Sequence, residues 1–427
     1  MSMNIHIQGG TLIDPAAGTE QQRDVYIEAG KVVALGAPPA GFQAQRTIDA
    51  TGLYVAPGFV DLSARLREPG YEHKATLDSE TAAALAGGVT SLVCPPDTDP
   101  VLDEAGLIEM LKYRAARLDR ARVYPLGALT VGLKGDVITE MVSLTEAGCI
   151  GFTQADKPIA DTQVMLRALQ YASTYGYAVW LRPQDAFLSK GGVAASGAVA
   201  SRLGLSGVPV SAETIALHTL FELIRVTGAR VHLMHLSSAA GVALVRAAKA
   251  EGLPVTCDVS ANHVHLIDMD IGYFDAQFRL DPPLRQQRDR DAIRAGLADG
   301  TIDAICSDHT PVDDDEKLLP FGEATPGSTE LELLLSLTVK WAGEAGVPLA
   351  RALARITSAP AGVMKLDAGH IAVGSSADLC VFDAHAHWHV EPRALKSQGH
   401  NTPFLGYELP AVVRTTLVAG RVGFERG

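Results

Sequence analysis

Histidine and aspartate side chains stand at the ends of two apolar, strand-like runs of the chain. His235 ends the run 230–235, and Asp308 follows the run 304–307. Imidazole and carboxylate groups each donate a lone pair to zinc at about 2.0–2.2 Å. A catalytic zinc needs about three protein donors besides its water, so these two residues alone do not make such a site. His232 precedes His235 by three residues, and this odd spacing puts the two rings on opposite faces of a strand.

Each of these groups also has a structural explanation. Without partners, His235 is expected to be a hydrogen-bonded core histidine, and Asp308 is expected to belong to a structural ion pair. The alternating histidines of the run 384–389, AHAHWH, are expected on the solvated face of a strand rather than at a metal. The acidic run 313–316 is expected to be a solvated loop.

The elements that must position these residues follow a regular alternation between residues 56 and 362. Strand-like apolar runs are separated by helix-like segments, and this order favours a (β/α)₈ TIM-type barrel. An open doubly wound sheet is the alternative, but no GxGxxG motif follows the first strand. In a barrel, chemistry lies where the strands end. We expect strands at 58–62, 91–94, 122–125, 151–153, 178–181, 230–235, 254–258 and 304–307, and helices at 79–86, 104–118, 161–174, 212–226, 239–251 and 288–298.

Short strands with turn residues between them mark both ends of the chain. Neither end is long enough to build a stable core alone, so we expect one small β-sandwich-like domain formed by both termini. The expected parts are 1–55, the barrel at 56–362, and 363–427. The expected terminal strands are 4–8, 25–28, 31–35, 370–373, 379–382 and 412–422.

The composition is typical of a globular protein. Hydrophobic residues make up 47% of the 427 residues, and the net charge of −13 argues against a nucleic-acid partner. No signal peptide and no run of about 20 apolar residues is found, so no membrane association is expected. Five scattered cysteines suit reduced thiols, and we therefore expect a cytoplasmic protein.

Motifs along essentially the whole chain resemble those of dihydroorotases, which belong to the amidohydrolase superfamily. The segment 57–70, PGFVDLSARLREPG, is similar to the family's PGFVDLHVHLREPG. The resemblance implies a barrel that interconverts carbamoyl aspartate and dihydroorotate, with zinc polarising the amide carbonyl and activating a bound water. Further similar motifs are SRLGLSGVP (201–209), GARVHLMHLSS (228–238), PPLR (282–285), DGTIDAICSDHTP (299–311), ITSAPA (356–361) and NTPFLGYEL (401–409).

Most positions that match the family's zinc ligands hold other residue types. The resemblance retains two ligand positions, His235 and Asp308, the latter as a vestigial catalytic residue. A guanidinium stays protonated and has no lone pair for a metal, so no metal cofactor is expected. If the two arginines point inward, we expect them to pair with Asp308 in the space of the zinc. The lost ligand positions are Ser63, Arg65, Gln154 and Arg182.

The substrate side also departs from the family. Arg67 matches the residue that binds the substrate carboxylate, and His309 is retained beside Asp308, so both are vestigial substrate-binding candidates. Asp97 and Asp281 stand where the family has asparagines. Two carboxylates would repel a dianionic substrate, and this loss looks independent of the metal loss.

Three functions are open at this point. The resemblance implies foremost a non-catalytic, dihydroorotase-like subunit that assembles with aspartate carbamoyltransferase, the preceding enzyme of pyrimidine biosynthesis, as part of an oligomer. The alternative is an active dihydroorotase or other cyclic-amide hydrolase with a rebuilt, mononuclear zinc site, for which Ser63, Gln154 and Asp156 are weak extra donors. The third is a module that senses a carboxylate through Arg65, Arg67 and Arg182.

Overall fold

Two runs of parallel strands form the centre of the molecule. The computed structural model describes residues 3–426. Three strands pair in the order β10-β9-β8, and six pair in the order β11-β12-β13-β16-β17-β18. Their bounds are β8 Phe59–Asp61, β9 Val89–Cys94, β10 Arg122–Pro125, β11 Gly127–Ala128, β12 Phe152–Thr153, β13 Ala178–Leu181, β16 Arg230–Leu233, β17 Val255–Ser260 and β18 Ala304–Cys306.

The two runs meet at both edges. β10 continues through Leu126 directly into β11, and Ala64 forms a parallel bridge with His309 just beyond β8 and β18. All eight predicted barrel strands are present, with ends within two residues of the prediction. The pairing is consistent with the predicted barrel, and it brings the ends of β8, β13 and β18 to the same side of the sheet.

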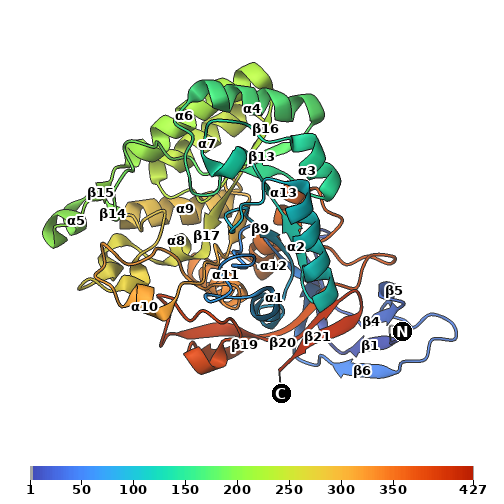
Figure 1. The fold of residues 1–427 in the computed structure, drawn as a ribbon. Helices are drawn as coiled ribbons and strands as arrows, with labels where there is room; N and C mark the ends of the chain where they lie inside the picture. Colours follow the sequence, from blue (N-terminus) through green and yellow to red (C-terminus); the bar gives the residue numbers. More distant parts are fainter. Residues whose placement is uncertain (1–2, 427) are drawn as a thin grey trace.

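Helices follow most of these strands and cover them from outside (Figure 1). The six predicted helices are confirmed. In α4 the buried residues Met165, Ala168, Leu169 and Ala172 recur at i, i+3, i+4 and i+7, which is the face of an amphipathic helix that packs on a sheet. The main helices are α1 Leu77–Ala86, α2 Ala105–Leu118, α3 Met141–Ala147, α4 Thr162–Tyr175, α6 Val210–Thr227, α7 Ala239–Glu251, α9 Gln287–Asp299, α11 Leu334–Ala345, α12 Leu349–Leu353 and α13 Ser358–Met364.

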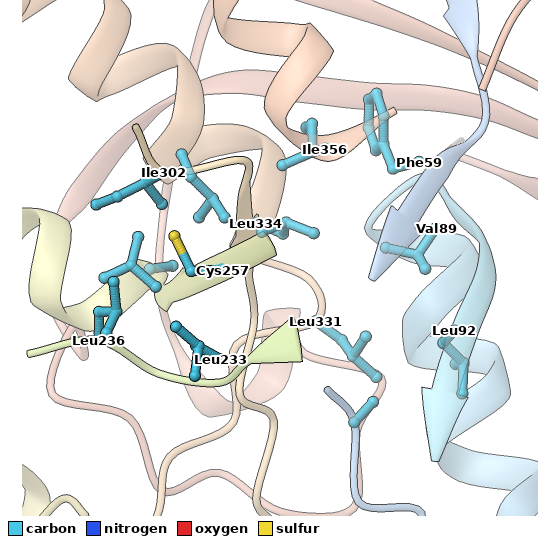
Figure 2. Packing of buried hydrophobic residues seen from close by; sticks show 14 of the residues in the cluster. Phe59, Val89, Leu92, Leu233, Leu236, Cys257, Ile302, Leu331, Leu334 and Ile356 are labelled. Carbon is cyan, nitrogen blue, oxygen red and sulfur yellow. The ribbon is translucent and has the colours of Figure 1, made fainter. Parts of the chain in front are cut away.

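The main hydrophobic core lies between the parallel strands and these helices. Figure 2 shows Phe59 and Val89 on one side of it and Leu233 and Cys257 on another, with Leu334 between helix and strand. Each of these side chains is fully buried. Burial of one such side chain stabilises the fold by roughly 1.5–3 kcal/mol, so the core fixes where each strand ends.

Strands from both ends of the chain share one sheet, as expected. Its order is β21-β20-β19-β7-β2-β3, and a four-stranded sheet, β5-β4-β1-β6, lies beside the N-terminus at the same end of the molecule (Figure 1). The sandwich-like packing and the three domain boundaries stay predictions. The bounds are β1 Ile5–Gln8, β2 Thr11–Asp14, β3 Thr19–Gln22, β4 Val25–Glu28, β5 Lys31–Leu35, β6 Arg46–Asp49, β7 Tyr54–Pro57, β19 Leu379–His389, β20 Glu408–Val418 and β21 Arg421–Glu425.

Two expectations need correction. The segment 370–373 is not a strand, because Ile371 N–H donates to the Asp14 side chain and a turn at 372–375 follows. The acidic run 313–316 is not simply a loop, since α10 (Asp314–Lys317) begins within it. The histidine run 384–389 does lie on β19, with its histidines on the exposed face as predicted. Across residues 3–426, no helix is long and apolar enough to cross a membrane.

Candidate functional site

Arg65, just beyond the end of β8, is buried among carboxylates from three other strand ends. Its Nε donates to Asp97 Oδ2 at 2.7 Å, and a second nitrogen donates to Asp156. A third contact places its Nη1 3.5 Å from Asp308 Oδ1 and 3.0 Å from Thr310 Oγ1. Every nitrogen of this guanidinium therefore has an acceptor.

Arg182, one residue beyond β13, repeats this arrangement on the opposite side of the same space. Its Nη1 donates to Asp156 Oδ1 at 3.0 Å, and its Nη2 donates to Asp281 Oδ2 at 2.9 Å. Asp156 thus accepts from Arg65 with one carboxylate oxygen and from Arg182 with the other. We call Arg65, Arg182, Asp97, Asp156, Asp281 and Asp308 the arginine–aspartate network.

The electrostatics of the network follow from burial opposed by ion pairing. Burial alone would raise the pKa of Asp156, but Arg65 and Arg182 lower it to about 2. Burial raises the pKa of Asp308 to about 6, which its more distant contacts with His235 and Arg65 only partly offset. The network is therefore held mainly by Asp156, and Asp308 is its weakly paired member.

Four residues at these strand ends have left-handed backbone conformations. The φ angles are 61° at Arg67, 51° at Ala155, 54° at His235 and 53° at Asp308. A residue with a Cβ pays roughly 1–2 kcal/mol for this conformation. Such strain persists where the surroundings impose it, and it is common at functional sites. The backbone at the strand ends thus has the geometry of a functional site.

His235 is buried next to the network and its ring makes no hydrogen bond within the described part of the chain. Its Nε2 lies 3.7 Å from Asp308 Oδ1. Its main-chain N–H donates to Asp258 Oδ1 at 2.6 Å, while the ring of His232 contacts Asp258 Oδ2 at 3.0 Å. We expected His235 to be a hydrogen-bonded core histidine. It is buried, but within residues 3–426 only its main-chain N–H, and not its ring, forms a hydrogen bond.

A zinc ion of the kind that dihydroorotases use does not fit the residues at this site. Two of the positions carry guanidinium groups that are already bonded to carboxylates, and a guanidinium cannot bind a metal. Gln154 Oε1 accepts from the Thr130 hydroxyl at 2.9 Å, which leaves Ser63 as a poor neutral donor. Only His235 and Asp308 remain, one short of three protein donors.

A second group of possible donors lies deeper in the strands. One ligand atom each of His235, Asp258 and Cys306 lie within 4.8 Å of one another, and all three residues are buried. Both oxygens of Asp258 already accept hydrogen bonds, as described above. Burial raises the pKa of the Cys306 thiol well above its usual range, so a thiolate ligand would be costly to form.

The predicted substrate-binding residues lie beside the network with protein partners. His309 is buried, its Nε2 contacts Glu80 Oε2 at 2.6 Å, and its Nδ1 accepts from the Glu330 N–H at 3.1 Å. Arg67 Nε donates to Pro311 O at 2.8 Å. Within residues 3–426, Arg67 forms no ion pair shorter than 4 Å, unlike the two arginines of the network.

The expectation that Arg65 and Arg182 both pair with Asp308 describes the network only in part. The partner that both share is Asp156, and the others are Asp97 for Arg65 and Asp281 for Arg182. In the sequence, the loss of metal ligands looked independent of the loss of substrate-binding residues. In the structure, Arg65 pairs with Asp97 and Arg182 pairs with Asp281, so each ion pair joins one residue of each kind. The sequence did contain a sign of this pairing. Asp97 and Asp281 stand where the family has neutral asparagines, and Arg65 and Arg182 stand at lost ligand positions.

Comparison with known proteins now gives the family. A dihydro-orotase-like family model matches residues 52–240, and an amidohydrolase family model matches residues 221–424. A dihydroorotase-like protein of Pseudomonas putida is 44% identical over 420 residues, covering 98% of this chain and 99% of that protein. This chain belongs to the dihydroorotase-like family of amidohydrolases. A dihydroorotase of Anaeromyxobacter sp. (strain K) is 40% identical over 429 residues, covering 100% of this chain and 99% of that protein.

Solved structures support the fold of this dihydroorotase-like chain. The L-hydantoinase (dihydropyrimidinase) from Arthrobacter aurescens superposes with a TM-score of 0.87 at 24% identity, covering 100% of this chain and 97% of that one. A D-hydantoinase superposes with a TM-score of 0.83 at 23% identity, covering 98% and 95%. The chain therefore has the α/β amidohydrolase fold.

Proposed function

We propose that this chain is a non-catalytic dihydroorotase-like protein of pyrimidine biosynthesis, built on a closed (β/α)₈ barrel. The observation that carries the proposal is the double contact of Asp156 with Arg65 and Arg182. A hydrolase of this family needs a metal and a water between the strand ends. In this chain, the ion pairs of Asp156 fill that space. A hydrolytic reaction would first have to break these pairs.

The same contacts argue against binding of a dianionic substrate at the strand ends. Asp97 and Asp281 add negative charge beside the strand ends, which disfavours a dianionic ligand there. A carboxylate sensor that used Arg65 or Arg182 would have to displace an aspartate from a buried pair. Loss of such a charged partner costs about 1–3 kcal/mol, so neither role is favoured.

We further propose that the chain is a structural subunit of aspartate carbamoyltransferase. The strained strand ends and the buried core keep an enzyme-like frame, although the ligand residues have changed. A structural subunit must keep its fold and its contact surface, but it does not need a catalytic site. This combination supports an assembly role for the chain, in the cytoplasm and within an oligomer.

The assembly role is tested by reconstitution. The catalytic chain of aspartate carbamoyltransferase from the same genome is purified with and without this protein. The mass of the assembly is measured by light scattering after size exclusion, together with carbamoyl aspartate synthesis. We expect a larger assembly that contains both chains. Two separate species at micromolar concentrations of both chains would contradict the role.

One observation favours a second candidate, a hydrolase with a rebuilt mononuclear metal site. His235, Asp258 and Cys306 supply three possible donors, and both ring nitrogens of His235 are free of hydrogen bonds within the described residues. Zinc bound in a 1:1 ratio to the wild type and lost in His235→Ala, together with hydrolysis of a cyclic amide, would favour this candidate. A metal-free, inactive protein after dialysis against zinc would eliminate it.

A further inference from the structure

Two loops beyond the strand ends expose large apolar side chains. One loop follows β17 and α8 (Ala261–His265) and includes the short helix η2 (Asp268–Ile271), and the other follows β18 and contains α10. The exposed fraction is 91% at Tyr273 and 82% at Leu318. We define the apolar patch as the exposed residues of these two loops: Met269, Tyr273, Phe274, Leu318 and Leu319.

Buried polar contacts hold these two loops in place. The ammonium group of Lys317 is buried and donates to Ala276 O at 3.1 Å and to Arg279 O at 3.3 Å, which ties one loop to the other. On the far side, Lys74 Nζ lies 2.6 Å from Glu316 Oε2. Burial lowers the pKa of Lys317 to about 7, and nearby Asp275 and Glu316 only partly offset this effect. The loops are thus held in one arrangement, yet their apolar side chains lie in solvent.

A third segment supports the two loops. The arm of β14 (Ala194–Ala195), α5 (Ala198–Leu203) and β15 (Gly207–Val208) projects on the same side of the molecule as α10 (Figure 1). Ala194 and Ala200 of this arm share a small buried cluster with Ile271 and Phe321, which lie under the two loops. The arm therefore buttresses the loops and leaves the apolar patch uncovered within the described chain.

Acidic residues predominate in the two loops that carry the apolar patch. Segments 266–275 and 312–324 contain eight acidic residues and one basic residue, the buried Lys317. Asp270, Asp275, Asp314 and Asp315 are exposed. An ordered apolar surface with a polar rim marks a contact site, and its charge selects the partner. A second copy that docked through the same two loops would bring the same acidic residues against them.

We propose that the apolar patch is the docking face for a partner protein whose contact surface combines apolar side chains with lysine or arginine. This inference rests on the proposed assembly role and names the face that serves it. Since the loops are already ordered, docking loses little conformational entropy, which favours affinity. Tyr273 and Leu318 present the most apolar surface to such a partner, because they are the most exposed apolar residues of the patch.

The test compares two double variants of the full-length protein. Tyr273→Asp with Leu318→Asp places charges in the apolar patch, and Tyr113→Asp with Val226→Asp is the matched control on α2 and α6. The control residues are 63% and 73% exposed. The dissociation constant for the catalytic chain of aspartate carbamoyltransferase is measured by calorimetry, and unfolding curves check the fold. We expect binding at least about tenfold weaker for the patch variant and within about twofold of wild type for the control.

A charge-reversal variant tests the rim separately. Asp314→Lys with Asp315→Lys should weaken binding at low salt and reduce the dependence of the dissociation constant on salt concentration. Equal affinity of the patch variant and the wild type would overturn the docking face while the assembly role stands. A changed oligomeric state of the patch variant alone would reassign the patch to self-association and overturn the proposal. No complex with the wild type would overturn the assembly role and the docking face together.

Discussion

Arg65 Nε lies 2.7 Å from Asp97 Oδ2, and both residues stand where the family pattern has other types. Each change would be harmful alone, because it would bury one charge without its partner. Together they form a pair, and Arg182 with Asp281 forms a second one at 2.9 Å. The departures from the family pattern are therefore coupled, and ion pairs stand where the family pattern has metal ligands and substrate-binding residues.

A double-mutant cycle tests this coupling directly. Arg65→Met should destabilise the protein by about 1–3 kcal/mol, because the half-buried carboxylates of Asp97 and Asp156 would lose the buried cation that they share. Asp97→Asn should cost less in the Arg65→Met background than in the wild type, with a coupling of about 1–3 kcal/mol. Urea unfolding measures all four free energies of unfolding, and strict additivity would contradict the coupling.

Arg182 should matter far more than an exposed arginine with similar contacts. Arg182→Met is expected to cost about 1–3 kcal/mol, since it removes the buried cation of Asp281 and one of the two cations of Asp156. Arg225 also contacts two carboxylates, Glu222 and Glu251, but lies at the surface. Arg225→Met is the matched control and should cost under about 1 kcal/mol. Equal free energies of unfolding for the two variants would show that the network is not a buried, mutually dependent unit.

Much of the fold could be predicted from periodicity and motifs. The strand 178–181 and the helix 239–251 have the predicted bounds, because an apolar run and a capped amphipathic helix are local signals. The strand predicted at 370–373 is wrong because the Ile371 N–H donates to a distant side chain, Asp14, and not to a neighbouring strand. Such a long-range hydrogen bond leaves no trace in local periodicity.

The sequence predicted where the candidate site lies, but it predicted only part of the ion pairs within it. The strand-end rule correctly placed Arg65, Arg182 and Asp308 together. The central role of Asp156 was missed, since the sequence suggested it only as a weak extra metal donor, and a left-handed Ala155 (φ 51°) precedes it. Backbone turns of this kind decide where a side chain points, and a single sequence gives little sign of them.

A buried acid outside the network predicts a pH dependence of stability. Burial raises the pKa of Glu330 from 4.5 to about 8, and a hydrogen bond from Thr402 Oγ1 only partly offsets this. Between these two values the folded chain holds a proton that the unfolded chain has lost. Glu330 therefore contributes stability that is present below about pH 4.5 and is lost as the pH rises through about 8.

The variant Glu330→Gln isolates this effect. Other buried acids titrate in the same range, so the quantity to measure is the difference between the unfolding free energies of wild type and variant at each pH. This difference should shift against the wild type by up to about 1.4 kcal/mol per pH unit between pH 5 and 8. A difference that does not change with pH would mean that Glu330 is ionised in the folded protein.

Restoring imidazoles should restore metal binding if the strand ends keep the geometry of a metal site. The variant Ser63→His, Arg65→His, Arg182→His would present three new rings beside His235 and Asp308. We expect about one zinc per chain after dialysis, measured by elemental analysis. The same three positions changed to asparagine are the control, which should bind none. A folded histidine variant without zinc would show that the backbone frame is not that of a metal site.

The central claim is that the arginine–aspartate network has replaced the hydrolytic site. Its most direct test is ring opening of dihydroorotate by the purified chain at neutral pH with zinc supplied, beside an authentic dihydroorotase. We predict no turnover above the uncatalysed rate, from a folded protein whose Arg65 and Arg182 remain paired with Asp156. Turnover that rises with protein concentration and disappears in His235→Ala would contradict the account.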